Sequence, residues 1–297
     1  MKRFKLLVLF AAVLPAQALG APSKAPPAMA VAPAPAWHVE VKQVFGFVPG
    51  FMMGVPPEAG DAWWMGFKGL YLGETALPGK IKSMISIAVA SQIPCQYCTY
   101  ADTTFAMKLE GASQREVNEA VMMASITRLA STILNGSGQE EADFKKEADA
   151  IFAKAKKGPD KAMVAIEVKD GPSALKDVQQ TFGLVPTFIK RVPDKMQAPL
   201  WLMMKNFQLN PATALPNKYK ELIGLGVAAQ IPCKYCMYFH REAARLNGAT
   251  QAEIDEAVAV AGDTRAASAL MYGGQLDLAK FKKEIDAVVK NLQKSMK

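Results

Sequence analysis

Residues 90–98 read Ala-Ser-Gln-Ile-Pro-Cys-Gln-Tyr-Cys, and residues 228–236 read Ala-Ala-Gln-Ile-Pro-Cys-Lys-Tyr-Cys. Seven of the nine positions are identical between the two stretches. Further matching pairs extend the similarity on both sides: 45–51 with 182–188, 76–78 with 214–216, and 111–113 with 248–250. Because the spacing between matching positions is almost constant along the chain, the chain is a tandem duplication with its seam near residues 154–170.

Helix signals recur in both copies. Ser113 is followed three residues later by Glu116, and Thr250 by Glu253, a spacing typical of the capping box that starts a helix. Apolar residues then follow at helical spacing: Val117, Ala120, Val121 and Ala124 in the first copy, and Ile254, Ala257, Val258 and Ala261 in the second. Neither copy shows a run of alternating β-branched residues between turn signals. We therefore predict an all-α fold with two tandem helical domains around a core rich in Ala and Met.

The N-terminus has the pattern of an export signal. Lys2, Arg3 and Lys5 precede an apolar run at residues 6–14, and small residues suited to cleavage follow that run. The run is shorter than a bilayer-spanning helix, although a retained membrane anchor is the alternative interpretation. We predict a signal peptide at 1–20, export to the periplasm and no stable membrane span in the mature chain.

Composition and charge limit the function classes. An Ala- and Pro-rich stretch at 21–37 cannot close a packed core and is predicted to be a tether. The remaining length suits two ordinary domains or one large one, and the duplication predicts two, at 38–153 and 168–297. The formal net charge is +8, but Lys and Glu are spread along the chain instead of forming a basic run with interleaved aromatic residues. This distribution argues against a nucleic-acid partner.

All four cysteines lie in two Cys-x-x-Cys pairs, Cys95–Cys98 and Cys233–Cys236, and each pair follows Ile-Pro. Proline suits the first turn of a helix, so Cys95 and Cys233 should lie where the helix dipole and unpaired amides stabilise a thiolate. His240, one of two histidines, follows Cys236 by four residues and shares its predicted helix face. Two thiols and an imidazole are the minimum set for reversible thiol redox chemistry, because one thiolate attacks, the other resolves and the imidazole moves a proton.

Other interpretations of these pairs remain open. A Cys-x-x-Cys pair in an exported protein is often a structural disulfide. A zinc site is a further alternative, although the two pairs are far apart along the chain and do not resemble the common short-spaced zinc modules. A thioredoxin-type motif would follow a strand, whereas the flanking sequence here looks helical. We predict that the protein uses no metal and no cofactor.

Glu221, Cys233, Cys236 and His240 have the spacing Glu-x11-Cys-x2-Cys-x3-His, which resembles the signature of the AhpD-like alkylhydroperoxidases in the carboxymuconolactone decarboxylase superfamily. The sequence Val-Pro-Thr-Phe at 185–188 is similar to the Val-Pro-x-Phe motif of that superfamily. The resemblance covers nearly all of the second copy and, less fully, the first. It implies that Cys236 reacts with a hydroperoxide through a sulfenic acid, and that Cys233 supplies a proton and then closes the disulfide. By the same resemblance, Glu221 and His240 relay protons.

The first copy departs from this signature. Ser83 stands at the position of Glu221, and Asp102 at the position of His240. A serine cannot act as a base at neutral pH, and an aspartate charge near the cysteines disfavours their thiolates. We therefore expect the first pair of cysteines to be a secondary redox pair, and the first site to be slow or inactive as a peroxidase.

The predicted function is thiol-dependent reduction of a hydroperoxide, with a thiol reductant of unknown identity as partner. The usual reductant of the family, a dihydrolipoyl carrier, is cytoplasmic, whereas this chain is predicted to be exported. One alternative is a decarboxylase of the carboxymuconolactone type, although such enzymes do not depend on a Cys-x-x-Cys pair. Another is a non-enzymatic exported protein whose structural disulfides would resist glutathione. Because the family commonly forms trimers or hexamers of single domains, the tandem chain looks like a fused dimer that could form a homo-oligomer.

Overall fold

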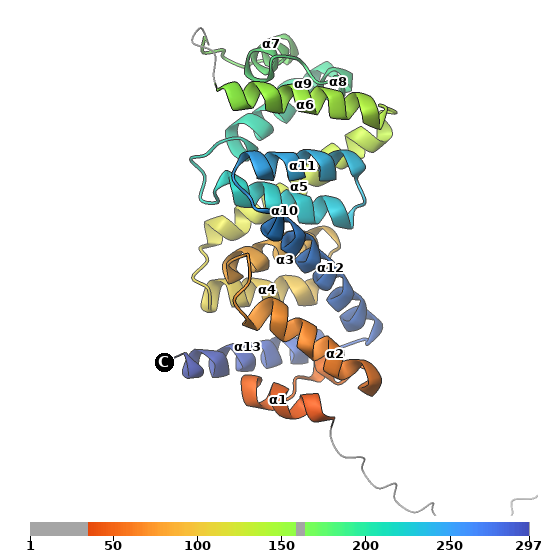
Figure 1. Ribbon diagram of the computed structural model, residues 1–297, viewed down its shortest axis with the longest axis vertical. Helices are drawn as coiled ribbons and strands as arrows, with labels where there is room; N and C mark the ends of the chain where they lie inside the picture. Colours follow the sequence, from red (N-terminus) through yellow and green to blue (C-terminus); the bar gives the residue numbers. More distant parts are fainter. Residues whose placement is uncertain (1–34, 159–163, 297) are drawn as a thin grey trace, which may run out of the picture. The chain divides into compact units, whose positions relative to one another are not determined.

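The computed structural model describes residues 35–158 and 164–296 of the chain. These residues form thirteen α-helices and three short helical turns (Figure 1). No strand occurs within these residues, so the all-α prediction is confirmed. The predicted signal peptide at 1–20 lies outside them. None of the helices in the described part is both long enough and apolar enough to cross a membrane.

The second copy repeats the element order of the first. The first copy contains α1 (Ala36–Phe45), η1 (Gly50–Met52), α2 (Pro57–Phe67), η2 (Lys68–Leu72), α3 (Gly79–Gln92), α4 (Gln96–Lys108), α5 (Gln114–Gly136) and α6 (Glu141–Lys157). The second copy contains α7 (Gly171–Phe182), α8 (Thr187–Arg191), α9 (Asp194–Met203), η3 (Met204–Gln208), α10 (Asn217–Gln230), α11 (Lys234–Leu246), α12 (Gln251–Gly273) and α13 (Leu278–Ser295).

The two predicted capping boxes start the longest helices. Ser113 at the start of α5 accepts a hydrogen bond from the backbone amide of Glu116, and the Glu116 carboxylate accepts one from the Ser113 amide. Thr250 and Glu253 make the same reciprocal pair at the start of α12. Each box satisfies amides that a helix end leaves without an intrahelical partner, which fixes where these helices begin.

The first helix begins before the predicted end of the tether. Ala36 and Trp37 fall within the stretch predicted as tether, but both belong to α1. Trp37 is only 2% exposed because it packs with Val41 and other apolar side chains in a cluster rich in aromatic residues. Burial of so large an apolar surface outweighs the tendency of the Ala- and Pro-rich flank to stay extended. The domain boundaries at 38–153 and 168–297 stay predictions.

The two copies interlock through their last helices. α5 and α12 each pack against both α3 and α10, so each of them bridges the two copies. The helix that follows each bridge then packs on the other copy: α6 packs on α11, and α13 packs on α4. α3 and α10 also contact each other directly between these bridges (Figure 1). Each copy therefore obtains part of its cover from the other.

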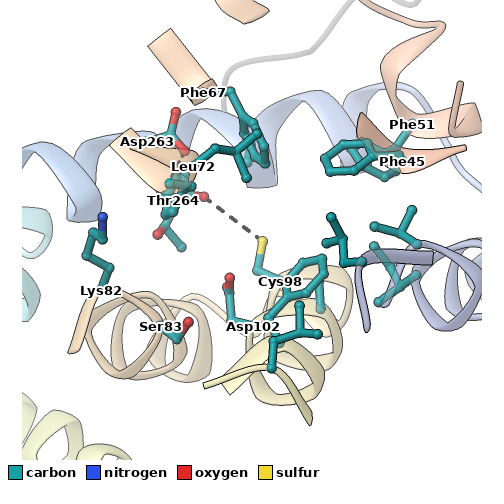
Figure 2. A pocket seen from close by; sticks show the side chains of 18 of the residues that line it. Phe45, Phe51, Phe67, Leu72, Lys82, Ser83, Cys98, Asp102, Asp263 and Thr264 are labelled. Carbon is teal, nitrogen blue, oxygen red and sulfur yellow. Dashed lines mark hydrogen bonds between the residues drawn. The ribbon is translucent and has the colours of Figure 1, made fainter. Parts of the chain in front are cut away.

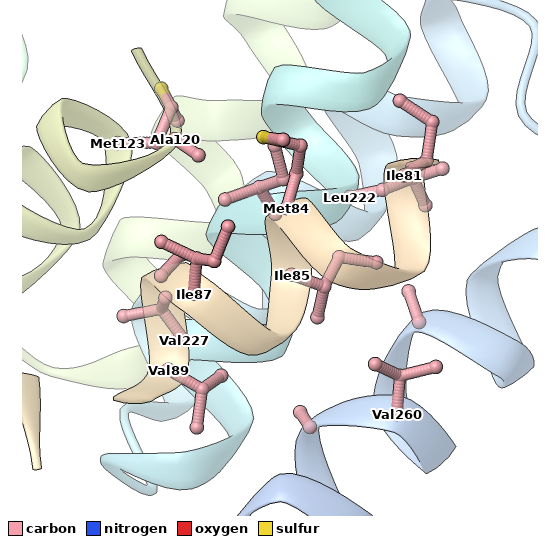
Figure 3. Close-up of a cluster of buried hydrophobic side chains, with 14 of the residues drawn as sticks. Ile81, Met84, Ile85, Ile87, Val89, Ala120, Met123, Leu222, Val227 and Val260 are labelled. Carbon is pink, nitrogen blue, oxygen red and sulfur yellow. The ribbon is translucent and has the colours of Figure 1, made fainter. Parts of the chain in front are cut away.

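The central core is shared by both copies (Figure 3). Residues 81–90 of α3 are all buried, which means that this helix is surrounded on every side. Its side chains pack with Met123 from α5 and Val260 from α12, among others. α10 approaches so closely at Gly226 that a Cβ atom there would lie 2.9 Å from Cγ2 of Ile85. The close approach explains why a glycine is needed in the middle of a buried helix.

Two equivalent sets of hydrogen bonds, here called the glutamate contacts, join the copies. Glu256 on α12 accepts from the backbone amides of residues 76–77 at 2.8 and 3.2 Å. Glu119 on α5 accepts from the backbone amides of residues 214–215 at 2.9 and 2.7 Å. Because the acceptors are charged, these bonds are stronger than bonds between neutral groups. They hold the segment that leads into α3 or α10 against the bridging helix of the other copy.

This interlocking predicts that neither half folds alone as a monomer. Residues 35–158 and 164–297, made as separate chains, should each be unfolded or self-associated, because each exposes the core surface that the other half covers. Mixing or co-expressing them should give a 1:1 complex with the circular dichroism and cooperative melting of the intact protein. A folded, monomeric half in analytical ultracentrifugation would contradict this interlocked architecture.

Candidate active site

The first cysteine of each pair caps a helix. Cys95 is the N-cap residue of α4, and its sulfur accepts a hydrogen bond from the backbone amide of Cys98 at 3.2 Å. Cys233 caps α11 in the same way and accepts from the amide of Cys236, also at 3.2 Å. Both pairs thus lie at helix starts, as predicted. An amide donor and the helix dipole favour a thiolate at the capping sulfur when the pair is reduced.

Both pairs are closed as disulfides, with Cα–Cα distances of 5.4 and 5.3 Å. The capping cysteine of each pair is completely buried, whereas Cys98 and Cys236 each line a cavity. The second cysteine of each pair is therefore the one that a small molecule can reach. Within the described ranges, no group of three or more His, Cys, Asp or Glu residues is arranged to hold a metal ion.

In the second copy, the structure brings together the predicted Glu221 and His240. Nδ1 of His240 lies 2.7 Å from Oε2 of Glu221, and both side chains are almost completely buried. Nε2 of His240 lies 3.2 Å from the hydroxyl of Thr127, which comes from α5 of the first copy. A carboxylate on one ring nitrogen fixes the orientation and tautomer of an imidazole, so that the other nitrogen is available for proton transfer. The second site therefore depends on a residue from the first copy.

Two further residues shape this pair. The amide nitrogen of Gln208 donates to Oε1 of Glu221 at 3.1 Å, so both carboxylate oxygens have a partner. Gly224 lies on the face of α10 that meets the imidazole. Its missing side chain makes room for the ring, because a Cβ atom there would lie 2.5 Å from Cε1 of His240. The first copy has Ser86 at the position of Gly224. The imidazole and this glycine therefore occur together in the second copy.

Cys236 and His240 line the same small cavity, of about 50 Å³. Its remaining wall is mostly apolar, with side chains from both copies: Ile126, Ala130, Leu134 and Phe144 from the first, and Phe188, Met204 and Phe239 from the second. Such a site excludes most water and presents one sulfur and one imidazole to a bound molecule. This combination allows thiol chemistry assisted by a proton transfer.

The first copy presents a different set of groups around its disulfide (Figure 2). Cys98 and Asp102 project from α4 toward α12, where Asp263 and Thr264 lie (Figure 2). The sulfur of Cys98 lies 4.0 Å from the backbone carbonyl oxygen of Thr264. Ser83, in place of the second-site glutamate, donates to Glu110 at 3.1 Å.

Three carboxyl groups line this first site, and the pKa of each is raised. Burial raises the pKa of Asp102 well above its usual range, and the neighbouring Asp263 and Glu110 raise it further by like-charge repulsion. Burial also raises the pKa of Asp263 and of Glu110, although Tyr71 and Ser83, respectively, donate a hydrogen bond to each. The repulsion predicted from sequence assumed a charged Asp102. The raised pKa favours its neutral form, which weakens the repulsion expected against a cysteine thiolate.

The four residues of the second site were predicted from sequence, but the residues that hold them were not. Thr127 matches Thr264 of the second copy, but this match alone does not show that Thr127 contacts His240. Gln208 and Gly224 carry no local motif, and only the packing of η3 and α10 around Glu221 and His240 reveals them. The same limit applies to Asp263 and Glu110 of the first site, whereas Asp102 was identified from the repeat.

The glycine at position 224 yields a stability prediction with a matched control. Gly224→Ala should lower the free energy of unfolding by about 1–3 kcal/mol, since the added methyl group must displace the imidazole of His240. Gly262→Ala, on an exposed face of α12 where a Cβ atom meets nothing within 4 Å, should instead raise it by about 0.5–1 kcal/mol. Chemical denaturation measures both. Equal stabilisation by the two substitutions would show that the imidazole is not held against residue 224.

The raised pKa values predict an unusual pH dependence. In the folded protein Asp102 holds its proton above its ordinary pKa of 3.8, so the folded state binds more protons than the unfolded state, and stability falls as pH rises through the raised pKa. Asp102→Asn should therefore stabilise the protein at pH 7.5, and this gain should shrink toward pH 4. The surrounding groups, Asp263, Glu110, Lys82 and Tyr71, are unchanged in the variant. Denaturation curves at the two pH values test this, and a variant that is less stable at pH 7.5 would contradict it.

Comparison with known proteins agrees with the duplicated helical structure. The model of the carboxymuconolactone decarboxylase family matches residues 57–136 and, again, residues 196–275. The two matches fall one in each copy and together cover more than half of the chain. No curated protein and no solved structure shows significant similarity to it. From the two family matches, this chain belongs to the carboxymuconolactone decarboxylase family, in a tandem duplicated form.

Proposed function

We propose that the second site reduces a small hydroperoxide with its pair of cysteines. The observation that carries the proposal is the buried contact of 2.7 Å between Glu221 and His240, with His240 and Cys236 lining one cavity. A carboxylate that orients an imidazole beside a reachable sulfur is the arrangement that peroxide reduction needs. The first site has the sulfur but not this pair.

In the first step, the thiolate of Cys236 attacks one oxygen of the hydroperoxide, and the O–O bond breaks. The sulfur is oxidised to a sulfenic acid, and the departing alkoxide takes a proton and leaves as an alcohol. His240 supplies this proton from Nε2, while Glu221 stabilises the imidazolium that forms when the ring takes the thiol proton. Thr127 holds the same nitrogen at 3.2 Å and positions it.

In the second step, the sulfur of Cys233 attacks the sulfenic sulfur of Cys236, the S–O bond breaks and water leaves. The disulfide between these two residues is the product. An external dithiol then attacks the sulfur of Cys236, because Cys233 is completely buried. Cys233 leaves as a thiolate that the backbone amide at 3.2 Å stabilises, which favours this direction of exchange.

The dimensions of the site limit the substrate. A cavity of about 50 Å³ accepts only a few non-hydrogen atoms, and it is much smaller than the cavity of about 150 Å³ that binds benzene in another protein. Hydrogen peroxide or a short alkyl hydroperoxide therefore fits better than an aromatic one. The apolar wall favours an alkyl group over a charged one.

A decarboxylase-type lyase and a protein with structural disulfides are the two alternative functions. They differ from a peroxidase in whether and how the cysteines are used. A lyase of the decarboxylase type could use the Glu221–His240 pair but would not need Cys236. A protein with purely structural disulfides would hold both pairs closed against glutathione. The export signal proposed at 1–20 would place the protein in the periplasm, where the reductant must be a periplasmic dithiol.

Substitutions at the second site should abolish or lower peroxide turnover. We expect Cys236→Ser to abolish the consumption of hydrogen peroxide with dithiothreitol as reductant, and His240→Ala or Glu221→Ala to lower it by about 10-fold or more. Cys98→Ser is the matched control in the first copy and should keep most of the activity. No turnover by the unmodified protein would favour the lyase or the structural interpretation, and full turnover by Cys236→Ser would place the peroxide chemistry at another group. Complete loss in a folded Cys98→Ser variant would show that the two pairs act in series.

A further inference from the structure

We propose that the cavity beside the first disulfide binds a small organic cation, an ammonium group attached to an aromatic ring or a short alkyl chain. The cavity is separate from the second site and lies between α4 of the first copy and α12 and α13 of the second (Figure 2). The proposal does not depend on peroxidase activity.

The cavity is large enough for such a ligand. Its volume is about 160 Å³, roughly three times that of the cavity at the second site. An engineered apolar cavity of about 150 Å³ in another protein accepts benzene. The walls are mostly aliphatic and aromatic, and aromatic rings line them on several sides, among them Phe45, Phe51, Phe67 and Phe281. These walls provide the apolar surface that an aromatic or alkyl group would bury.

One end of the cavity is acidic. Asp102 projects into it, and no hydrogen bond to its carboxyl group is formed by the residues that the structure describes (Figure 2). Asp263 and Glu110 line the same end, and each accepts one hydrogen bond from a hydroxyl group. The donor to Asp263 is Tyr71, at 3.0 Å, and the donor to Glu110 is Ser83, at 3.1 Å. Three carboxyl groups thus converge on a space enclosed by apolar side chains.

The lysine at this cavity offsets the charge of the cluster only in part: burial raises the pKa of Glu110 on balance, although Lys82, like Lys80, acts on Glu110 and lowers that pKa. Nζ of Lys82 donates to the backbone carbonyl oxygen of Leu70 at 2.6 Å and to the hydroxyl of Thr75 at 2.9 Å. Its nearest carboxylate is that of Glu256, at 3.8 Å, which belongs to the glutamate contacts. The ammonium group of Lys82 therefore makes its hydrogen bonds within the fold. The acidic end of the cavity keeps more carboxyl groups than ammonium groups.

The second copy has the same backbone framework without this cluster. When the two copies are aligned on their capping boxes, Asp263 matches Ile126 and Glu110 matches Asn247. The acidic end is thus a property of the first site, to which both copies contribute, and not a requirement of the fold. Residues that support the helices, such as the capping cysteines, are the same in both copies. The difference in carboxyl groups is therefore specific to the cavity.

A cation fits this chemistry better than a neutral molecule or an anion. Carboxyl groups in an apolar enclosure resist ionisation, and a bound ammonium group would allow Asp102 to ionise and to accept its hydrogen bonds. Phe67 and Tyr71 also line the cavity, with their ring centroids 5.2 Å apart, and an aromatic ring can attract a bound cation. An anion would offer no positive charge to balance an ionised Asp102, and it would be repelled by any of the three carboxyl groups that is ionised.

Three probes of the same shape test the charge requirement by isothermal titration calorimetry of the intact protein at pH 7.5: 2-phenylethylammonium, 2-phenylethanol and 3-phenylpropionate. We expect the cation to bind at least about 10-fold more tightly than the alcohol, since one charge-assisted hydrogen bond is worth about 1.5–3 kcal/mol. The carboxylate should not bind. Equal binding of the alcohol, or tighter binding of the carboxylate, would overturn the proposal.

Variants assign the binding to this cavity. Asp102→Asn should weaken binding of the cation by about 10-fold or more, whereas Asp255→Asn, on an exposed face of α12, should leave it unchanged. Ala267→Phe places a ring in the cavity and should abolish binding of both the cation and the alcohol. If Asp102→Asn does not fold, Glu110→Gln takes its place. Binding that survives Ala267→Phe in a folded protein, or no binding of the cation to the unmodified protein, would contradict the assignment.

Discussion

The packing of α3 against α10, with α5 and α12 bridging both, is the constraint on which the two sites and the glutamate contacts depend. Gly226 allows the close approach, and the glutamate contacts hold the segments before α3 and α10 in place. Because the bridging helices come from the opposite copy, neither site is built from one repeat alone. Thr127 reaches His240 from the first copy, and α12 brings a carboxyl group and a threonine to the first disulfide. Loss of the interlocking would therefore disturb both sites together.

Within this shared frame, a few side chains separate the chemistry of the two copies. Both copies retain a capping cysteine whose sulfur accepts a hydrogen bond from a backbone amide. Both also retain a second cysteine that lines a cavity. The second copy adds a buried carboxylate and imidazole in contact, and the imidazole lines the same cavity as Cys236. The first copy places Asp102 where the imidazole would be, with a larger cavity beside it. The duplication thus supports two different site chemistries on one set of helices.

Much of this could be predicted from sequence, because the signals are local. The capping boxes at Ser113 and Thr250 fix helix starts, and the regular spacing of the repeats fixes the duplication. His240 was identified by its spacing to the cysteines and Glu221 by the resemblance to a family signature, and their contact needs only two consecutive helices. The interlocking could not be predicted, since helical periodicity shows which face of a helix is buried but not which copy covers it. For the same reason Thr127 and Asp263 were missed, because each acts on the site of the opposite copy.

Whether peroxide chemistry belongs to Cys236 is decided most directly by locating the first oxidised sulfur. Two variants are compared in the reduced form. Cys233→Ser leaves Cys236 without its resolving partner, and Cys95→Ser leaves Cys98 without its resolving partner. Each variant is treated with one equivalent of hydrogen peroxide and a dimedone-type trap for sulfenic acids, and labelled peptides are quantified over time by mass spectrometry. We expect rapid labelling of Cys236 in the first variant and much slower labelling of Cys98 in the second. Equal rates at the two sulfurs, or no labelling of Cys236, would contradict the assignment of peroxide chemistry to the second site.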